Sequence, residues 1–395
     1  MNAGLWNFDQ AELIPIDFAR MATDGPEGMC ALLADLNPNT GVISKAPPPF
    51  LAQLLPQHFA YWDDFSIPIA SMDRPEVPLQ TWRLRNVCVT GREGAVVFPT
   101  GNCLGHSLDF GALHEPDANF QRTQAGYLLK SAPTGKIADP CFLGYRAGYR
   151  NYAHWMLEHS VFLHAYVRHF SDAGVKLLLP EQLNPNYRQL LDLFGISPSS
   201  IIWLGPEPVI VDDLVACDVG DPELQPSIAR EVFGLLRAAV PGAPVMRRGL
   251  FVSRTDAHFR PLLNEAELSE ALAATGVEIF APGQHSLSTQ AAAFASSRVI
   301  IGGHGAGLSN IVFCRPGTIV LELMPEYCLC ELYYRTAAAC DLAYGFVSGT
   351  SFNNDIAHLA SRQGENWGAA WVISVESVMR EVEKILESLP EGDAG

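Results

Sequence analysis

The chain has 395 residues, 48% of them hydrophobic, and its 26 basic and 43 acidic residues give a formal net charge of −17. A low content of charged residues with a large apolar fraction argues against disorder and for large cores, and the length suggests two domains, or three small ones. The acidic balance argues against general nucleic-acid binding, because a phosphate backbone is repelled and the basic residues occur only singly or in pairs.

The amino terminus, residues 1–9, lacks the basic and apolar regions of a secretory signal. No apolar stretch approaches the ~18 residues that a membrane-spanning helix needs. We therefore expect a cytoplasmic protein and leave open a peripheral contact with the inner face of the membrane. The nine cysteines show no disulfide-framework spacing, which fits a reducing compartment.

The first 135 residues are irregular, with short β-type runs at 82–90 and 94–99, and are interpreted as a β-rich lead-in. From about residue 138 short apolar runs alternate with longer amphipathic segments. The apolar spacing predicts strands at 141–143, 175–179 and 200–204 and helices at 151–170 and 187–194. This β-α-β-α-β order is typical of a parallel sheet covered by helices. We assign residues 1–245 to one domain, with a Rossmann-like part at 136–240.

After the Pro-Gly-Ala-Pro linker at 241–244 the pattern starts again, and residues 246–364 form the second predicted domain. Helix 264–274 has Asn264 as its N-cap and Glu267 three residues later, a variant of the capping box. The final amphipathic helix spans 375–389. The other elements expected here are strands at 249–253, 277–280, 298–301 and 318–323 and helices at 287–296 and 329–339. Two such units place a ligand at strand carboxyl ends, in a cleft between them.

The densest signal is a buried strand that runs into Gly302-Gly303-His304-Gly305-Ala306-Gly307 and then a short helix. Glycines let the backbone approach a ligand, and the N–H groups at a helix start attract an anion, most often phosphate. A tight turn in which the glycines only relieve packing is the alternative. The dinucleotide fingerprint fails at Leu308, and no nucleophile elbow follows that would make this the oxyanion turn of a hydrolase.

A second segment, at 151–159, places His154 and Glu158 four residues apart on one helix face. A histidine and a carboxylate so placed can form a general base with its orienting partner. A helix face with a half-buried histidine is the alternative reading.

A third segment ends an apolar strand in Ser253 and Arg254, which places a hydroxyl and a guanidinium at its carboxyl end. Arginine matches phosphate oxygens bidentately and stays charged, although a structural pair with Asp256 is an equal alternative. Glu322 lies inside another apolar strand and needs a hydrogen-bond partner if it is buried. A sugar hydroxyl and a backbone group are the two candidates for that partner.

Together these segments resemble the family 61 glycosyltransferases, including the bacterial capsular-polysaccharide type. The matching pieces are an H-W-x-x-E helix, an S-R-x-D strand end followed by L-L-N-E-x-E-L, and G-x-H-G-A-G-L-x-N with P-G-T-x-V-x-E-L downstream. They occur in the family's order over roughly residues 140–350, while the first 130 residues match no pattern.

The resemblance implies two Rossmann-like domains facing a cleft (the GT-B architecture), nucleotide-sugar donors, of which a UDP-sugar is the first candidate, and inversion at the anomeric carbon. It also implies a C-terminal helix, 375–390, that packs back on the first domain. By the same resemblance, the charge of the leaving diphosphate would be neutralised by Arg254, His304 and the amides of Gly305, Ala306 and Gly307.

We count Ser253 and Asn310 with this donor site, and by the resemblance Glu322 would touch the ribose or the sugar. Across the cleft, Glu158 or His154 would be the base that activates a glycan or another hydroxyl acceptor. The sequence contains no D-x-D, so we expect no metal and no cofactor besides the donor.

The predicted function is sugar transfer from a nucleotide-diphosphate donor, in bacterial surface polysaccharide synthesis. A non-catalytic nucleotide-sugar or carbohydrate-binding protein on the same scaffold is the first rival. An α/β hydrolase that uses the His304 turn is the second, and the missing nucleophile elbow counts against it.

Overall fold

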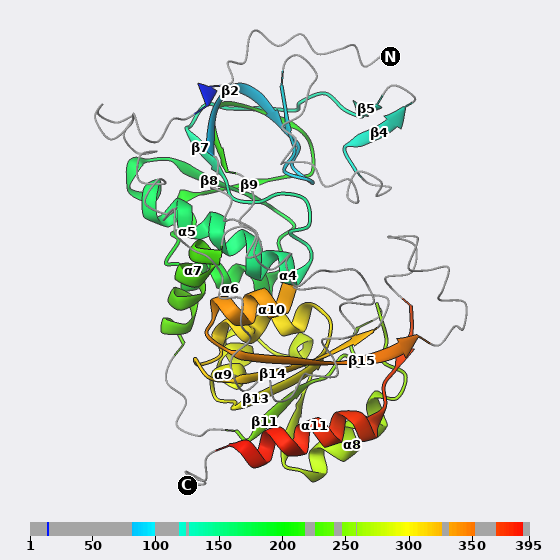
Figure 1. The fold of residues 1–395 in the computed structure, drawn as a ribbon. Coiled ribbons are helices and arrows are strands. Elements are labelled where there is room, and N and C mark those ends of the chain that lie inside the picture. The colour runs from blue at the N-terminus through cyan, green and yellow to red at the C-terminus, as the bar shows by residue number, and fades with distance from the viewer. Residues whose placement is uncertain are drawn as a thin grey trace. The chain divides into compact units, whose positions relative to one another are not determined.

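The computed structural model describes residues 14–15, 81–98, 118–123, 126–217, 226–240, 247–257, 259–325, 332–351 and 369–389 (Figure 1). These residues fall into two compact units, the first ending at Val232 and the second beginning at Phe233. The predicted linker at 241–244 and most of the lead-in lie outside the described residues. The fold is mixed α/β, as the sequence pattern predicts.

The first unit contains an eight-stranded sheet whose central strands run in the order β2-β10-β7-β8-β9. The strands β10, β7, β8 and β9 are parallel, and β2 is antiparallel to β10. The bounds are β2 (Thr81–Val89), β7 (Cys141–Leu143), β8 (Lys176–Pro180), β9 (Ile201–Leu204) and β10 (Val209–Cys217). The short strands β1 (Ile14–Pro15) and β3 (Val96–Val97) pair with β2, and β6 (Lys136–Ile137) pairs with β10; β4 (Phe120–Thr123) pairs separately with β5 (Gly126–Leu129).

The predicted helix at 151–170 is confirmed, with one difference in its first half. It begins as α4 (Tyr152–His154), continues as a π-helical turn η5 (Trp155–His159) and ends as α5 (Ser160–His169). The side chain of Asn151 accepts a hydrogen bond from the Ala153 N–H and caps the start. The remaining helices are η6 (Ser171–Ala173), α6 (Pro185–Leu193), η7 (Pro198–Ser200) and α7 (Pro226–Ala238), and the division between the units falls inside α7.

The second unit contains a six-stranded sheet in the order β12-β11-β13-β14-β15-β16, and only β16 is antiparallel to its neighbour. The chain starts at β11, moves out to β12 and then returns past β11 to β13, so the strand order reverses between β11 and β13. Ligands of such sheets bind where the order reverses, at the strand carboxyl ends. The bounds are β11 (Gly249–Val252), β12 (Val277–Phe280), β13 (Val299–Gly303), β14 (Ile319–Pro325), β15 (Ala343–Ser351) and β16 (Trp371–Val372).

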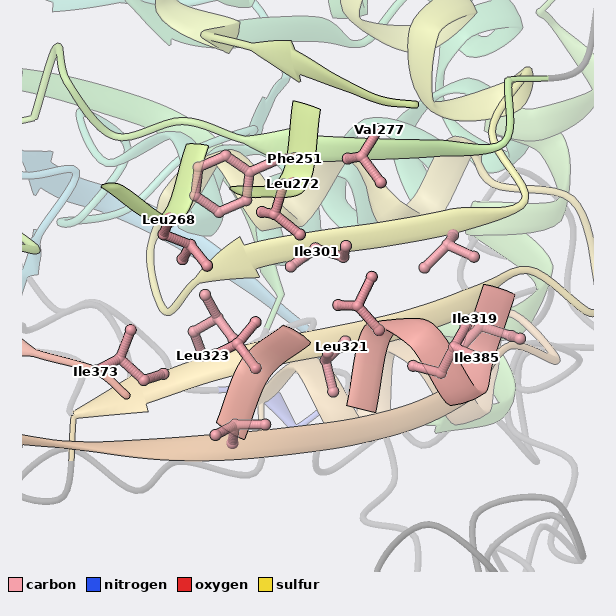
Figure 2. Close-up of a cluster of buried hydrophobic side chains, with 14 of the residues drawn as sticks. Phe251, Leu268, Leu272, Val277, Ile301, Ile319, Leu321, Leu323, Ile373 and Ile385 are labelled. Atoms are coloured by element: carbon pink, nitrogen blue, oxygen red, sulfur yellow. The ribbon is translucent and has the colours of Figure 1, made fainter. Parts of the chain in front are cut away.

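Helices cover both faces of this second sheet, and Figure 1 shows α10 and α11 on opposite faces. The apolar side chains of α8 and α11 pack with those of the strands in one buried cluster, in which Leu321, Leu323 and Ile385 lie together (Figure 2). The bounds are α8 (Glu265–Ala274), η8 (Pro282–Gln284), α9 (Leu287–Ala295), η9 (Ala306–Phe313), α10 (Leu332–Ala339) and α11 (Val375–Ser388).

Two local expectations differ from the structure. Helix α11 packs in the core of the second unit through Val378, Val382 and Ile385, whereas the resemblance implies that it packs on the first domain. These side chains recur at helical spacing and need an apolar partner, which α8 and the sheet provide. Asn264 does not cap α8 with its side chain; its amide group instead bonds the backbone of Ile373.

Candidate functional site

The second unit places one candidate site at the carboxyl ends of β11 and β13. Ser253 and Arg254 directly follow β11, and His304 directly follows β13. The two strands are neighbours, with Val252 opposite Gly302, so the residues that follow them lie at the same edge of the sheet. The strand order reverses between these two strands. The donor residues predicted from the sequence therefore lie at the carboxyl ends where a ligand is expected.

The side chain of Arg254 lies directly against the glycine turn that follows β13. A Cβ atom added to Gly305 would lie 1.4 Å from Nη1 of Arg254, and one added to Gly303 would lie 2.9 Å from its Cδ. The φ angle of Gly305 is 170°, which any residue adopts, so the absence of a side chain here serves the close approach and not the backbone conformation. Arginine and the amides of the turn thus face the same small volume.

The charge of Arg254 is only partly compensated by the protein. Its Nη2 donates a hydrogen bond to the carbonyl oxygen of Phe259 at 2.6 Å, while its buried Nε finds no acceptor among the described residues. Burial lowers the pKa of Arg254, and the nearby positive charge of Arg260 lowers it further. Two arginines held this close favour an anion, because an anion relieves their mutual repulsion.

His304 belongs to a buried chain of hydrogen bonds. Its Nδ1 lies 2.6 Å from Oε1 of Glu322, and the hydroxyl of Tyr344 donates to Oε2 of the same carboxylate at 2.5 Å. Because an ionised carboxylate has no proton to donate, Nδ1 carries the proton of this bond. The arrangement orients the imidazole of His304 and stabilises a positive charge on it.

Glu322 and Asn310 are enclosed by protein partners in this structure. Both residues are 0% exposed. The two carboxylate oxygens of Glu322 bond His304 and Tyr344, and the expected contact with ribose or sugar stays a prediction. The amide nitrogen of Asn310 donates to Gln290 and to the carbonyl of Gly307. Both residues instead hold the glycine turn and His304 in place.

The glycine turn itself continues as η9, a 3₁₀ helix that begins at Ala306. The hydroxyl of Tyr333 donates to the carbonyl of Gly305 at 2.6 Å, and the Tyr333 ring packs edge-on against His304. The predicted short helix after His304 is therefore confirmed, in 3₁₀ form. Its first amides, at Ala306 and Gly307, belong to the unpaired N–H groups that every helix start presents.

The first unit places a second cluster after β7. Nδ1 of His154 lies 2.6 Å from Oε1 of Glu158, and Arg146 forms an ion pair with the other oxygen of Glu158. The His154 side chain is 45% exposed, whereas that of Glu158 is 11% exposed. Glu158 lies in the π-helical turn, a deviation that occurs often at functional sites. The predicted pair of His154 and Glu158 is thus brought together, with the histidine toward solvent.

The environment of Glu158 keeps its carboxyl ionised. Burial alone would raise the pKa, but the hydrogen bond and charge of His154, together with the charge of Arg146, outweigh it and lower the pKa to about 2. A carboxylate with so low a pKa is a weak base at neutral pH. Its bond to Nδ1 instead fixes the orientation of His154 and leaves Nε2 as the ring nitrogen that points away from Glu158.

His159 supports this cluster from the interior. It is 0% exposed, its Nδ1 lies 2.8 Å from the carbonyl oxygen of His154, and its Nε2 accepts from the N–H of Arg146 at 3.2 Å. Burial lowers the pKa of His159 to about 4, so the ring is neutral at neutral pH. The neutral ring ties the backbones of Arg146 and His154 together.

Three residues of these clusters escaped the sequence reasoning: Arg146, Tyr333 and Tyr344. Arg146 had a signal, because it closely follows the apolar strand β7 as Arg254 follows β11. The two tyrosines come from later parts of the chain, and their relation to His304 and Glu322 appears only in the folded structure.

Neither a metal cluster nor a membrane-spanning helix is found within the residues that the structure describes. In these ranges no group of three His, Cys, Asp or Glu side chains is arranged to hold a metal ion. Likewise, none of the helices within the described ranges combines the length and the apolar character needed to cross a bilayer.

Residues 152–321 match the model of the family Glycosyltransferase 61. This part of the chain is similar to the family 61 glycosyltransferases. The matched segment runs from α4 to β14 and contains His154, Glu158, Arg254 and His304, so the family 61 similarity covers residues from both clusters. The match supports a glycosyltransferase, with a sugar donor and an acceptor as its substrates. A search of curated proteins found no significant match.

Proposed function

We propose that the protein is an inverting, metal-independent glycosyltransferase that uses a nucleotide-diphosphate sugar. The observation that carries the proposal is the packing of Arg254 on the glycine turn beside His304, at the reversal point of the second sheet. Glycosyl transfer of this kind requires stabilisation of the charge that develops on the departing nucleoside diphosphate. An arginine, an oriented histidine and the first amides of η9 are groups suited to that task.

The second unit supplies the donor site in this proposal. The guanidinium of Arg254 and the N–H groups of Ala306 and Gly307 bind the diphosphate, whose departure leaves negative charge on the bridging oxygen. His304 faces the same charge as an imidazolium that Glu322 stabilises through Nδ1. A UDP-sugar is the first donor to test, as the resemblance described in the sequence analysis implies.

The first unit supplies the base. Nε2 of His154 takes the proton from the acceptor hydroxyl as its oxygen attacks the anomeric carbon, and the nucleoside diphosphate leaves from the opposite face. Such a single displacement inverts the anomeric configuration. Glu158 remains ionised, orients His154 and stabilises the imidazolium that forms, as the acid of a catalytic triad does. The acceptor in this proposal is a glycan, and the biological role is bacterial surface polysaccharide synthesis.

The proposal is tested with a panel of UDP-, GDP- and ADP-sugars and oligosaccharide acceptors, by measuring release of the nucleoside diphosphate. We expect turnover with at least one donor. Arg254→Ala should lower kcat by about 10²–10³, the range for loss of one charge-stabilising group. Arg380, an exposed arginine on α11, gives the matched control Arg380→Ala, which should retain wild-type turnover. Turnover of no donor, or an unaffected Arg254→Ala variant, would refute the donor site.

A further inference from the structure

The carboxylate of Glu265 makes two bonds to the residues that end β11. Its Oε1 accepts the hydroxyl of Ser253 at 2.6 Å and the backbone N–H of Arg254 at 2.9 Å. Glu265 is the first residue of α8, and its side chain is 6% exposed. It therefore reaches back from a helix start to a strand end and joins two elements of the same site.

This contact is unusual for the first turn of a helix. Acidic residues there commonly bond the N–H groups of their own helix or simply face its positive end. Glu267, in the same turn, is exposed, whereas Glu265 accepts both of its hydrogen bonds from the segment that carries Arg254. A buried carboxylate is retained where its hydrogen bonds fix a geometry, because burial without such bonds is costly.

The geometry that Glu265 fixes is the direction in which Arg254 leaves the strand. Its bond to the Arg254 N–H holds the backbone from which the guanidinium extends, and its bond to Ser253 holds the preceding residue. The guanidinium then lies against Gly305, where a Cβ atom would already collide with it. Such close packing tolerates little rotation of the Arg254 backbone.

We propose that Glu265 is a positioning residue, which holds the Arg254 guanidinium against the glycine turn so that it meets the diphosphate of the donor. This inference rests on the proposed function, since the anion at Arg254 is the donor diphosphate. Glu265 acts by its reach and its hydrogen-bond geometry, and its negative charge is not required. Ser253, whose hydroxyl is bonded to Glu265, belongs to the same support and does not contact the donor.

Two conservative variants distinguish the effect of the length of the Glu265 side chain from the effect of its negative charge. Glu265→Asp keeps the charge but shortens the side chain by one methylene, so it loses both bonds. Glu265→Gln removes the charge but retains a carbonyl oxygen at the same reach. We expect Glu265→Asp to weaken binding about tenfold and Glu265→Gln to change it less than about threefold, magnitudes that correspond to one hydrogen-bonded contact. The control Glu267→Asp should bind as the wild type does.

The experiment is a calorimetric binding cycle with inorganic pyrophosphate and with UDP, GDP and ADP. In the Arg254→Ala background, Glu265→Asp should cause no further loss, because the residue acts through Arg254. Additive losses, or equal binding by Glu265→Asp and the wild type, would overturn the positioning role and leave the proposed function intact. If the wild type binds no probe, the donor site itself is wrong, and this inference is overturned with it. Should Glu265→Asp fail to fold, a tenfold loss in the Glu265→Gln variant overturns the inference.

Discussion

At the scale of single residues, the proposed donor site depends on a missing side chain as much as on the groups that are present. The Arg254 guanidinium occupies the position in which a side chain at residue 305 would begin. The glycine there is not required by the backbone, whose φ angle of 170° is open to every residue. Its role is to leave space for the guanidinium.

Gly305→Ala therefore displaces the guanidinium without straining the chain. The atom in conflict is the far end of a flexible side chain, so we expect the melting temperature to change by less than about 1 °C, equivalent to a few tenths of a kcal/mol. The affinity for the nucleoside diphosphate should fall at least about tenfold, as measured by calorimetry. Gly135→Ala is the control, since a Cβ at that exposed position meets no atom within 4 Å. Unchanged affinity would show that Arg254 does not hold the diphosphate.

The assignment of the base is open to a direct kinetic comparison. His154→Ala should lower kcat by about 10²–10⁴, the range for loss of general base catalysis, with little change in donor affinity. Glu158→Gln should cause a smaller loss, because Glu158 acts through His154. Steady-state rates at saturating donor provide the measurement. A larger loss in Glu158→Gln than in His154→Ala would make Glu158 the base, the other assignment that the sequence leaves open.

The buried His159 predicts a specific dependence of stability on pH. Its pKa is about 4 in the folded protein and 6.5 in the unfolded chain, so the unfolded state binds more protons between these values. The free energy of unfolding must therefore fall as the pH drops from about 6.5 to 4, by about 3 kcal/mol for a shift of this size. Urea unfolding at several pH values measures this loss.

His159→Gln provides the comparison for that profile. The variant should be less stable at pH 7, because it loses ring packing, but its free energy of unfolding should vary less between pH 6.5 and 4. Below pH 4.5 both proteins should lose stability together, since Glu158 contributes its stabilisation only above that pH and loses it as the pH falls toward 2. Parallel profiles of the two proteins above pH 4.5 would contradict the burial of a neutral His159.

At the scale of elements, helix α11 completes the core of the second unit. Val378, Val382 and Ile385 lie in one cluster with β13 and β14 side chains. Figure 2 shows Ile385 near Ile319 of β14. Ile385 is 1% exposed, whereas Glu383 on the same helix faces solvent. The helix therefore covers an apolar face of the sheet that carries the donor site.

Truncation of one α11 side chain tests this packing. Ile385→Ala should lower the free energy of unfolding by about 2–5 kcal/mol, the range for removing a buried aliphatic side chain. Glu383→Ala should change it by less than about 0.5 kcal/mol, as expected for an exposed position. Chemical denaturation followed by fluorescence measures both. A near-neutral Ile385→Ala would show that α11 is dispensable for the second unit.

The elements that the sequence predicted have clear apolar periodicity, and two of the missed strands lack it; helix α7 was missed although its apolar residues recur at helical spacing. Strands at 141–143 and 277–280 and the final helix were predicted almost to the residue. Strand β10 was missed because Asp212 and Asp213 interrupt its apolar run, and β15 because glycines and serines dilute its pattern. Apolar periodicity indicates which positions of a strand or helix are buried. It does not reveal a strand in which polar residues are buried because they pair with other side chains.

The candidate site shows the same limit. Sequence order alone placed Arg254, His304, His154 and Glu158 at strand ends or on one helix face, and the structure brings each predicted pair together. The sequence order could not show that Glu322 is enclosed by His304 and Tyr344, because the partners of a buried carboxylate come from other strands. Motif position marks a residue as part of a site, while its burial decides whether it can touch a ligand.

At the scale of the whole molecule, the net charge of −17 opposes the binding of a diphosphate. In the second unit, Arg254 carries a positive charge at the glycine turn, and Arg260 lies near enough for its charge to lower the pKa of Arg254. A protein that binds a diphosphate needs a local concentration of positive potential, and in our proposal Arg254 provides it where the strand order of the second sheet reverses. In our proposal each unit contributes a histidine bonded to a buried glutamate. His154 of the first unit takes the proton of the acceptor hydroxyl, and His304 of the second unit stabilises the charge of the leaving group.

The most direct test of this account is a proton NMR time course of sugar transfer by the wild-type protein, which reports both the product and its anomeric configuration. The account predicts a glycoside whose configuration is inverted relative to the donor. Its formation should be slowed at least about a hundredfold both in His154→Ala and in Arg254→Ala. A product with retained configuration, or transfer that survives both substitutions, would contradict it.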